Sequence, residues 1–478
     1  MDWTGFEPRI GAAWKAFGSD KTVVRGGYAI YHDSAWSMGA QGLWQNPPYA
    51  AESFGSQFGG CTTVAAYCAS IPGQTPNVGP PATPTGYSAM VGFSDGFPIL
   101  TQPVTPLNFS GSFNTEPTNI KQGMVQQFNV NVERQLPAQI VLTAGYAGSR
   151  ARDILNFGNN INTGSPTACA GGLNAVPGYT LGCGPNGAYF PSPYATLFPF
   201  SNIYSINDFG RAHYNALIIK AETKSPRYGL YFLIGYTYSR TYDSGYSDGL
   251  STPIGALDFP LPNWRNLDWA LSQINLDNSF TASVIYDLPF GRGKKFGSSW
   301  NNVTNALLGG WQLTVIEKIT SGFPVFILDS NAASTGGANL INIGTASPAG
   351  RPNEVGNPFQ AGAVSANPTC AAPSKLSSSG FYFNPCAFMA PATGELGSAN
   401  RTPLSGPDFV NTDFSVIKRF ALPWENMGLD FRAEIFNLFN HAQFGLPASD
   451  VNAPSVFGQV FSTVNNPRLV QFGLKLTF

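Results

Sequence analysis

The final ten residues of the chain, 469–478, alternate between apolar and polar side chains with a period of two. One face of this segment carries Val470, Phe472, Leu474, Leu476 and Phe478. The other face carries Gln471, Gly473, Lys475 and Thr477. This pattern predicts a β-strand, and its length suits a tilted transmembrane strand, which needs roughly 9 to 11 residues. A final strand of a soluble β-sandwich would alternate in the same way.

The composition favours a chain that meets a second solvent besides water. Of the 478 residues only 11% are charged and 13% are aromatic, which is too apolar for disorder and too poor in charge for an ordinary soluble surface. No run approaches the roughly 18 apolar residues of a transmembrane helix. Transmembrane β-barrels combine these two properties, because their apolar residues occupy alternate positions. A net charge of −1 without a basic run argues against nucleic acid as a partner.

Ten further segments alternate like the terminal one, so we expect about eleven antiparallel strands. The ten are 10–14, 24–30, 128–132, 140–146, 217–221, 230–238, 280–288, 311–315, 414–420 and 429–435. Their connections are alternately short turns and long loops, the last three long ones being 243–276, 321–408 and 440–467. Outer-membrane barrels place short turns in the periplasm and long loops outside. The C-terminus is therefore expected in the periplasm and the long loops outside the cell.

The predicted strand count is odd, whereas bacterial single-chain barrels have an even number of strands. The N-terminus also lacks the basic and apolar regions of a secretory signal. We therefore expect residues 1–478 to form one barrel domain that is the C-terminal part of a longer protein. Glu317 and Lys418 fall on faces that are otherwise apolar, near strand ends where a charge costs less than at the midplane. A bulge or snorkelling would accommodate either residue.

The six cysteines fall as one local pair in each of three predicted outer loops. The pairs are Cys61 with Cys68, Cys169 with Cys183, and Cys370 with Cys386. In an oxidising compartment each pair is expected to form a disulfide that stabilises its loop by roughly 2.5 to 3 kcal/mol. Metal binding and free thiols are the competing interpretations. We disfavour metal because there is no CxxC spacing and the three histidines, His32, His213 and His441, are scattered.

No arrangement of residues predicts catalysis or a cofactor. The glycine-rich segment 291–297 lacks the spacing of a phosphate-binding loop and is interpreted as a turn. Asp243, Asp248 and Asp258 match no calcium loop and are interpreted as solvated loop acids. We therefore expect no enzyme, no metal site and no cofactor, and the substrate-binding residues stay unknown.

Several phrases, taken in order, resemble the C-terminal barrel of Oar-like TonB-dependent receptors. They are FEPRIGAAW at 6–14, TVVRGGY at 22–28, GYAGSR at 145–150, YTYSR at 236–240, YDLPFGRG at 286–293 and FRAEIFNLFN at 431–440. The terminal strand is similar to the closing strand of outer-membrane barrels, whose C-terminal Phe is read by the barrel-assembly machinery. The resemblance implies that Phe472, Leu474, Leu476 and Phe478 form this assembly signal.

The resemblance further implies a cell outer-membrane location, a 22-stranded barrel of which this chain is half, and contact with TonB through an N-terminal part. That part would hold the signal peptide, plug and TonB box that are missing here. The implied function is TonB-dependent uptake or binding of an unidentified extracellular substrate. A structural or adhesive surface barrel is the alternative, and a secreted β-sandwich lectin is a third. By itself the chain is expected to leave two open sheet edges.

Overall fold

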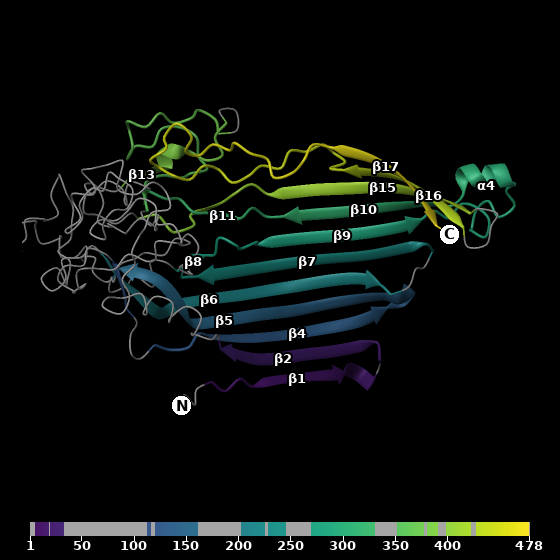
Figure 1. The fold of residues 1–478 in the computed structure, drawn as a ribbon, viewed down its shortest axis with the longest axis horizontal. Coiled ribbons are helices and arrows are strands. Elements are labelled where there is room, and N and C mark those ends of the chain that lie inside the picture. The colour runs from purple at the N-terminus through teal and green to yellow at the C-terminus, as the bar shows by residue number, and fades with distance from the viewer. Residues whose placement is uncertain are drawn as a thin grey trace, which may run out of the picture.

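The computed structural model describes residues 5–18, 20–32, 112–115, 120–160, 202–224, 228–244, 269–329, 351–376, 380–390, 398–421 and 427–477. Its main element is one sheet of 13 strands (Figure 1), in which eleven strands follow each other in chain order. These eleven are β1 (Arg9–Lys15), β2 (Thr22–His32), β4 (Met124–Leu136), β5 (Ile140–Asn160), β6 (Asn202–Thr223), β7 (Leu230–Asp243), β9 (Asn278–Asp287), β10 (Trp311–Thr320), β15 (Phe409–Ala421), β16 (Gly428–Phe436) and β17 (Leu469–Thr477).

Every neighbouring pair among these eleven strands is antiparallel. Each of the eleven predicted segments overlaps one of them, so the predicted all-β antiparallel fold is confirmed. The described short turns lie at one end of the sheet together with the C-terminus (Figure 1), and the strand ends that lead into the long connections lie at the other. Two of the short turns contain 3-10 helices, η1 (Ala16–Gly18) and η3 (Pro137–Gln139).

The strand register joins the apolar positions of all eleven strands into one face. Across four strands, for example, Leu313 pairs with Val416, Val416 with Ala433, and Ala433 with Phe472. One residue further along, Ser415 pairs with Glu434, and Glu434 with Gln471. Because successive side chains point to opposite faces, the sheet has one apolar and one polar surface.

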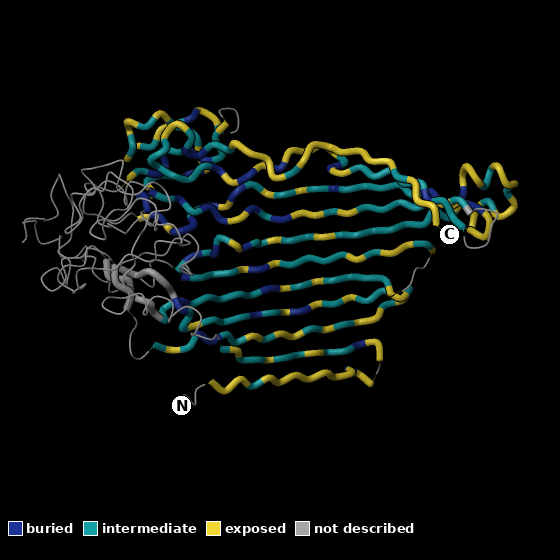
Figure 2. Tube along the Cα trace, viewed as in Figure 1, coloured by how far each residue is buried: buried dark blue, intermediate teal, exposed yellow. Residues whose placement is uncertain are grey.

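The apolar face is exposed rather than packed against other protein. Leu474 is 72% exposed and Phe472 is 70% exposed. Figure 2 shows that most strand residues are intermediate or exposed. Many of the buried residues lie instead near the strand ends that lead into the long connections. In a membrane barrel lipid covers such a face, because the apolar band points outward and the interior is polar.

β5 and β6 continue into segments that we predicted as loop. They span 21 and 22 residues, well beyond the alternating stretches 140–146 and 217–221. Their pairing shifts register three times beyond Ala151. Backbone pairing does not require apolar alternation, so the sequence pattern gave no sign of this extension. Two short strands join the same sheet: β3 (Ser112–Thr115) pairs with β6, and β8 (Ala270–Leu271) pairs with β7.

The described parts of the predicted loops 321–408 and 440–467 pack together into a unit with its own hydrophobic core, which we call the loop unit. It contains β11 (Pro324–Val325), β12 (Asn353–Glu354), η6 (Pro385–Ala387), β13 (Phe388–Met389) and β14 (Leu404–Ser405). Its core consists of Val325, Ile327, Phe383, Ala387, Phe388, Ala399, Leu404 and Phe457. Phe383 packs edge-to-face on Phe388 at 5.8 Å and on Phe457 at 5.1 Å between ring centroids. The described part of this segment has little regular secondary structure, as predicted, but its packing around a hydrophobic core was not predicted.

A short helix, α4 (Asn302–Leu308), lies between β9 and β10. It explains how Lys418, one of the two charged residues predicted on the apolar face, is accommodated. The side chain of Asn301 caps it by accepting from the backbone N–H of Thr304 at 2.8 Å. Lys418, only 2% exposed, donates its ammonium to the carbonyl of Gly309 just after the helix. Its Nζ also lies 5.4 Å from the ring centre of Trp311 and 5.1 Å from that of Phe420. Burial under α4, and not a bulge or snorkelling, accommodates Lys418.

Glu317, the other of these two charged residues, is held by a neighbouring strand. Its carboxylate accepts a hydrogen bond from Thr412 Oγ1 at 2.5 Å. The two residues are register partners on β10 and β15. A charge-assisted bond of this kind offsets part of the cost of placing a carboxylate near the apolar face.

Within the described residues, no helix is long and apolar enough to cross a membrane. In the same residues β1 pairs with β2 alone and β17 with β16 alone, so the sheet ends at these two strands.

Candidate functional site

The polar face of the sheet carries most of the charged side chains of the strands. By register it presents Arg9, Arg25, Glu133, Lys220, Glu222, Asp287, Lys318, Asp413, Arg419, Asp430, Arg432, Glu434 and Lys475. Apolar residues such as Leu233 and Ile316 interrupt it. Both charge signs alternate over this surface, which is typical of the water-filled interior of a membrane barrel.

Ion pairs between neighbouring strands organise this polar face. Arg25 on β2 contacts Glu133 on β4 at 2.5 Å, and Arg419 on β15 contacts Asp430 on β16 at 3.0 Å. The side chain of Arg419 is 70% exposed. Pairs this open contribute about 0 to 1 kcal/mol each, so their main effect is to orient the side chains.

A hollow of about 310 Å³ lies on β1, β2 and β4. Its lining residues are Arg9, Ile10, Gly11, Gly27, Tyr28, Ala29, Tyr31, Gln127 and Asn129. Gly11 and Gly27 are register partners on the polar face, and neither places a side chain in the hollow. The hollow therefore has a floor of backbone and a rim of polar and aromatic groups.

The rim of the hollow is held in place by contacts of its arginine. The guanidinium of Arg9 lies 4.7 Å from the ring centre of Tyr31 and donates to Glu7 at 3.1 Å. Glu7 also accepts from the backbone N–H of His32 at 2.9 Å. This backbone bond, with Arg9 adding to it, lowers the pKa of Glu7 below its ordinary value. A guanidinium, a phenol and two amides can bind anionic or hydroxyl-rich groups through hydrogen bonds.

The loop unit is attached to the sheet at the long-connection end by contacts with β7 and β8. Arg401 is fully buried and donates to the backbone carbonyl of Asp243 at 3.0 Å and to its carboxylate. The hydroxyl of Thr402 donates to the carbonyl of Leu271 at 2.7 Å. Interpreting Asp243 as a solvated loop acid was therefore wrong. Asp248 and Asp258 lie outside the described residues.

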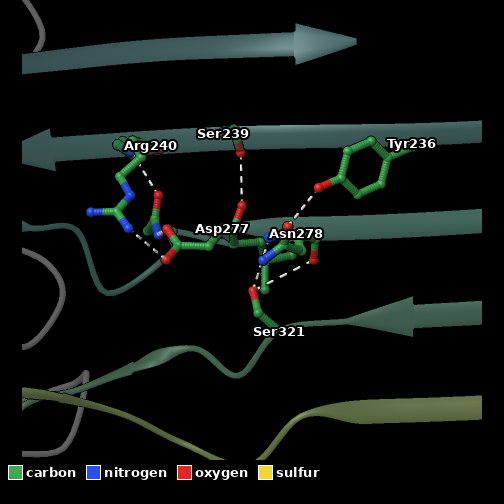
Figure 3. Close-up of polar contacts among 9 residues, drawn as sticks. Tyr236, Ser239, Arg240, Asp277, Asn278 and Ser321 are labelled. Carbon is green, nitrogen blue, oxygen red and sulfur yellow. Dashed lines mark hydrogen bonds and ion pairs between the residues drawn. The ribbon is translucent and has the colours of Figure 1, made fainter. Parts of the chain in front are cut away.

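Polar contacts also close the ends of β7 and β9 beside this attachment (Figure 3). Ser239 Oγ donates to the carbonyl of Leu276 at 2.7 Å, and Arg240 contacts Asp277 at 3.2 Å. The backbone N–H of Asn278 donates to Ser321 Oγ at 3.0 Å. These bonds give hydrogen-bond partners to backbone groups at the strand ends, next to Ser321, where the loop unit begins.

One of the three predicted cysteine pairs lies within the described residues. Cys370 and Cys386 form a disulfide within the loop unit, with Cα atoms 5.6 Å apart. Cys386 lies in η6, among the core residues Phe383 and Ala387. Cys61, Cys68, Cys169 and Cys183 lie outside the described residues.

The remaining predicted residues are placed as follows. Phe472, Leu474 and Leu476 lie together on the exposed apolar face, and Phe478 lies outside the described residues. Segment 291–297 forms a turn next to α4, with a hydrogen bond from Gly291 N–H to the carbonyl of Phe296 at 2.8 Å. In the described parts of the chain no three His, Cys, Asp or Glu side chains are placed to hold a metal ion.

The hollow and the Arg401 attachment were not predicted from the sequence. For the hollow a local signal exists, since Arg9, Gly11, Gly27 and Tyr31 all fall on the polar side of two alternating segments. For Arg401 there is none, because its partner is 158 residues away.

Solved structures with similar folds include several outer-membrane proteins. The outer membrane transporter YddB from Escherichia coli is 9% identical, with a TM-score of 0.42 over 98% of this chain and 40% of that one. The ferric enterobactin receptor PfeA from Pseudomonas aeruginosa, in complex with enterobactin, is 10% identical, with a TM-score of 0.40 over 98% and 40%. The FrpB iron transporter from Neisseria meningitidis is 10% identical, with a TM-score of 0.37 over 98% and 38%.

The chain thus spans 40% or less of the length of these structures. No curated protein sequence matches it. The family described as outer membrane beta barrel domain matches residues 1–471 of 478. Together with the exposed apolar face and the polar face, this match shows that the chain belongs to the outer membrane beta barrel domain family and resides in the outer membrane.

Proposed function

We propose that the chain is the C-terminal part of the barrel of a TonB-dependent receptor that binds an extracellular substrate. The observation that carries the proposal is the hollow on the polar face, because a binding site inside the barrel is what a receptor needs and a purely structural barrel does not. The ordered phrases from residue 6 to residue 440 that resemble Oar-like receptors support it. The proposal includes no catalytic step.

In this proposal the long connections face the outside and the C-terminus lies in the periplasm. The loop unit then stands at the outer mouth, fixed to β7 by Arg401. A substrate with anionic or hydroxyl groups would meet the loop unit first and the hollow at Arg9 and Tyr31 next. Hydrogen-bonding groups on a polar wall give specificity, because a substrate lacking the matching groups leaves them unpaired.

In the described part of the chain the sheet ends at β1 and β17, and these two edges suggest how the barrel closes. Open edges in hydrocarbon leave backbone donors and acceptors without partners, at several kcal/mol each. We propose that β1 and β17 pair with strands of an N-terminal half, giving an even-numbered barrel. That half would also carry the plug and the segment that contacts TonB.

The test compares residues 1–478 behind a signal peptide with the product of the longer reading frame. Each is produced in the outer membrane of strains with and without TonB. Assembly is measured by heat-modifiable migration, and uptake by mass-spectrometric depletion of nutrients from the medium. We expect stable assembly and TonB-dependent uptake from the longer product alone. Stable assembly with no TonB-dependent depletion would favour a structural or adhesive barrel. Transport by residues 1–478 alone would refute the half-barrel proposal.

A further inference from the structure

The apolar face ends, toward the long connections, at two tyrosine–asparagine hydrogen bonds. Tyr146 donates its hydroxyl to Asn215 Oδ1 at 2.7 Å, and Tyr236 donates to Asn278 Oδ1 at 2.7 Å (Figure 3). A ring on the apolar face with a hydrogen-bonded hydroxyl is typical of the boundary between hydrocarbon and headgroups. These bonds therefore mark the level at which the hydrocarbon ends.

Basic and aromatic side chains lie just beyond this level on the same face. Register pairs Asn215 with Arg240, and His213 with both Tyr242 and Arg150. The ring of Trp269 lies 4.8 Å from His213 and 6.1 Å from Tyr242. Together with a nearby arginine of β6 these residues form what we call the outward patch: Arg150, Arg211, His213, Arg240, Tyr242 and Trp269.

The arginines of the outward patch are fixed in direction. Arg150 donates to the backbone carbonyls of Ser149 and Tyr214 and to Asn215 Oδ1, at 2.8, 3.0 and 2.8 Å. All three acceptors are uncharged, so these bonds orient the guanidinium without neutralising it. The guanidinium of Arg211 lies 4.6 Å from the ring centre of Trp269. Arg240 pairs with Asp277 and keeps 45% of its side chain exposed.

The position of the outward patch relative to the membrane indicates which molecules lie beside it. The apolar face below it contacts lipid tails, so the molecules beside the patch are the headgroups of the same lipids. Phosphate is the anionic group that a planar guanidinium binds in two-point fashion, and basic pockets beside a hydrocarbon band attract such headgroups. We propose that the outward patch binds the phosphate-bearing headgroup of an outer-leaflet lipid. The choice of leaflet rests on the orientation given under the proposed function.

The test uses the longer product, extracted in detergent, and titrates it with diphosphorylated lipid A and with the same lipid after removal of its phosphates, using native mass spectrometry. We expect the phosphorylated form to bind at least about tenfold more tightly. Arg150→Gln should weaken that binding about tenfold, since it removes a charged donor from the contact. Arg150→Lys, which keeps the charge but not the fork, should fall between the two. Equal binding of the two lipids would overturn the proposal.

Arg419→Gln is the matched control, because this arginine lies on the polar face. It should bind the lipid like the unchanged protein, and an equal loss in both glutamine variants would show unspecific charge attraction and overturn the proposal. If Arg150→Gln does not assemble, Arg240→Gln is used instead, because Arg240 is more exposed. We expect this variant to bind the lipid about threefold more weakly, and unchanged binding would overturn the proposal. Preference for phosphatidylglycerol over lipid A would overturn the outer-leaflet assignment. The lipid titration contains neither TonB nor a transport substrate. Its result therefore does not depend on whether the uptake experiment under the proposed function succeeds.

Discussion

Arg401 and Asp243, 158 residues apart in the chain, form an ion pair in which the arginine is fully buried. The pair joins the loop unit to the end of β7. Asp243 keeps 22% of its side chain exposed, so removing Arg401 costs less than the about 3 to 5 kcal/mol of a fully buried pair. The position of the loop unit over the sheet therefore depends on this contact.

Arg401→Ala should detach the loop unit while the strands stay assembled. In the longer product we expect hydrogen exchange in residues 380–390 and 398–408 to rise about ten- to a hundredfold, with heat-modifiable migration unchanged. Arg419→Ala is the control, because its pair with Asp430 is exposed and contributes about 0 to 1 kcal/mol. Similar exchange in both variants would contradict the assigned role of Arg401.

Lys418→Met should lower the stability of the short-turn end of the sheet. The carbonyl of Gly309 would lose its buried donor, at about 1 to 3 kcal/mol, and the contacts with the rings of Trp311 and Phe420 would be lost as well. The measurement is the urea midpoint of unfolding in micelles. An unchanged or higher midpoint would show that the buried ammonium does not stabilise α4 against the sheet.

Leu474→Lys should impair membrane assembly more than Thr477→Lys. Leu474 is on the apolar face, where lysine costs roughly 2 to 4 kcal/mol near the midplane, whereas Thr477 lies on the polar face. The readout is the fraction of folded protein in outer membranes. Equal effects would remove the lipid-facing assignment, and with it the role of Phe472, Leu474 and Leu476 in an assembly signal.

Reduction of Cys370–Cys386 should destabilise the loop unit by about 3 kcal/mol, because the bridge closes a segment with a sequence separation of 16. Proteolysis of the loop unit with and without reductant measures this effect. Mass mapping under non-reducing conditions tests the other two predicted pairs. Peptides linking cysteines across loops, such as Cys61 to Cys183, would contradict the local pairing.

Tyr382 should make the loop unit sensitive to alkaline pH. Burial, with the negative charge of Asp408 adding to it, raises the pKa of Tyr382. Its hydroxyl donates to the carbonyl of Ser405 at 2.9 Å. Because the folded-state pKa is the higher one, this stabilisation is complete below the unfolded-state pKa of about 10 and is lost as pH rises through the folded pKa.

The measurement for Tyr382 is the tyrosinate absorbance of the unchanged protein minus that of Tyr382→Phe, followed as pH rises. We expect the difference to titrate above about pH 10. Tyr236→Phe is the control, because Tyr236 lies on β7 in the sheet and not in the loop unit. It shows how far the loss of any one tyrosine changes the absorbance. A difference that titrates at or below the ordinary value would contradict the burial of this phenol.

The sequence alone determined the eleven consecutive strands of the main sheet, their order and their two faces. Leu313, Val416, Ala433 and Phe472 come from four separate segments, yet each was predicted on the apolar side, and the register joins them in one row. The reason is physical: lipid on one side and polar groups on the other force a period of two within each strand, and such a period can be recognised without knowing the partner strand.

Only the tertiary structure decided the features that depend on distant contacts. The core of Phe383, Phe388 and Phe457, the burial of Lys418 beneath α4 and the pairing of Arg401 with Asp243 leave no periodic trace, because each depends on contacts between segments that are far apart in the sequence. The hollow at Arg9 and Tyr31 likewise exists only because β1 and β2 bring Gly11 opposite Gly27. The local solvent therefore determines the strands, whereas long-range packing determines the site.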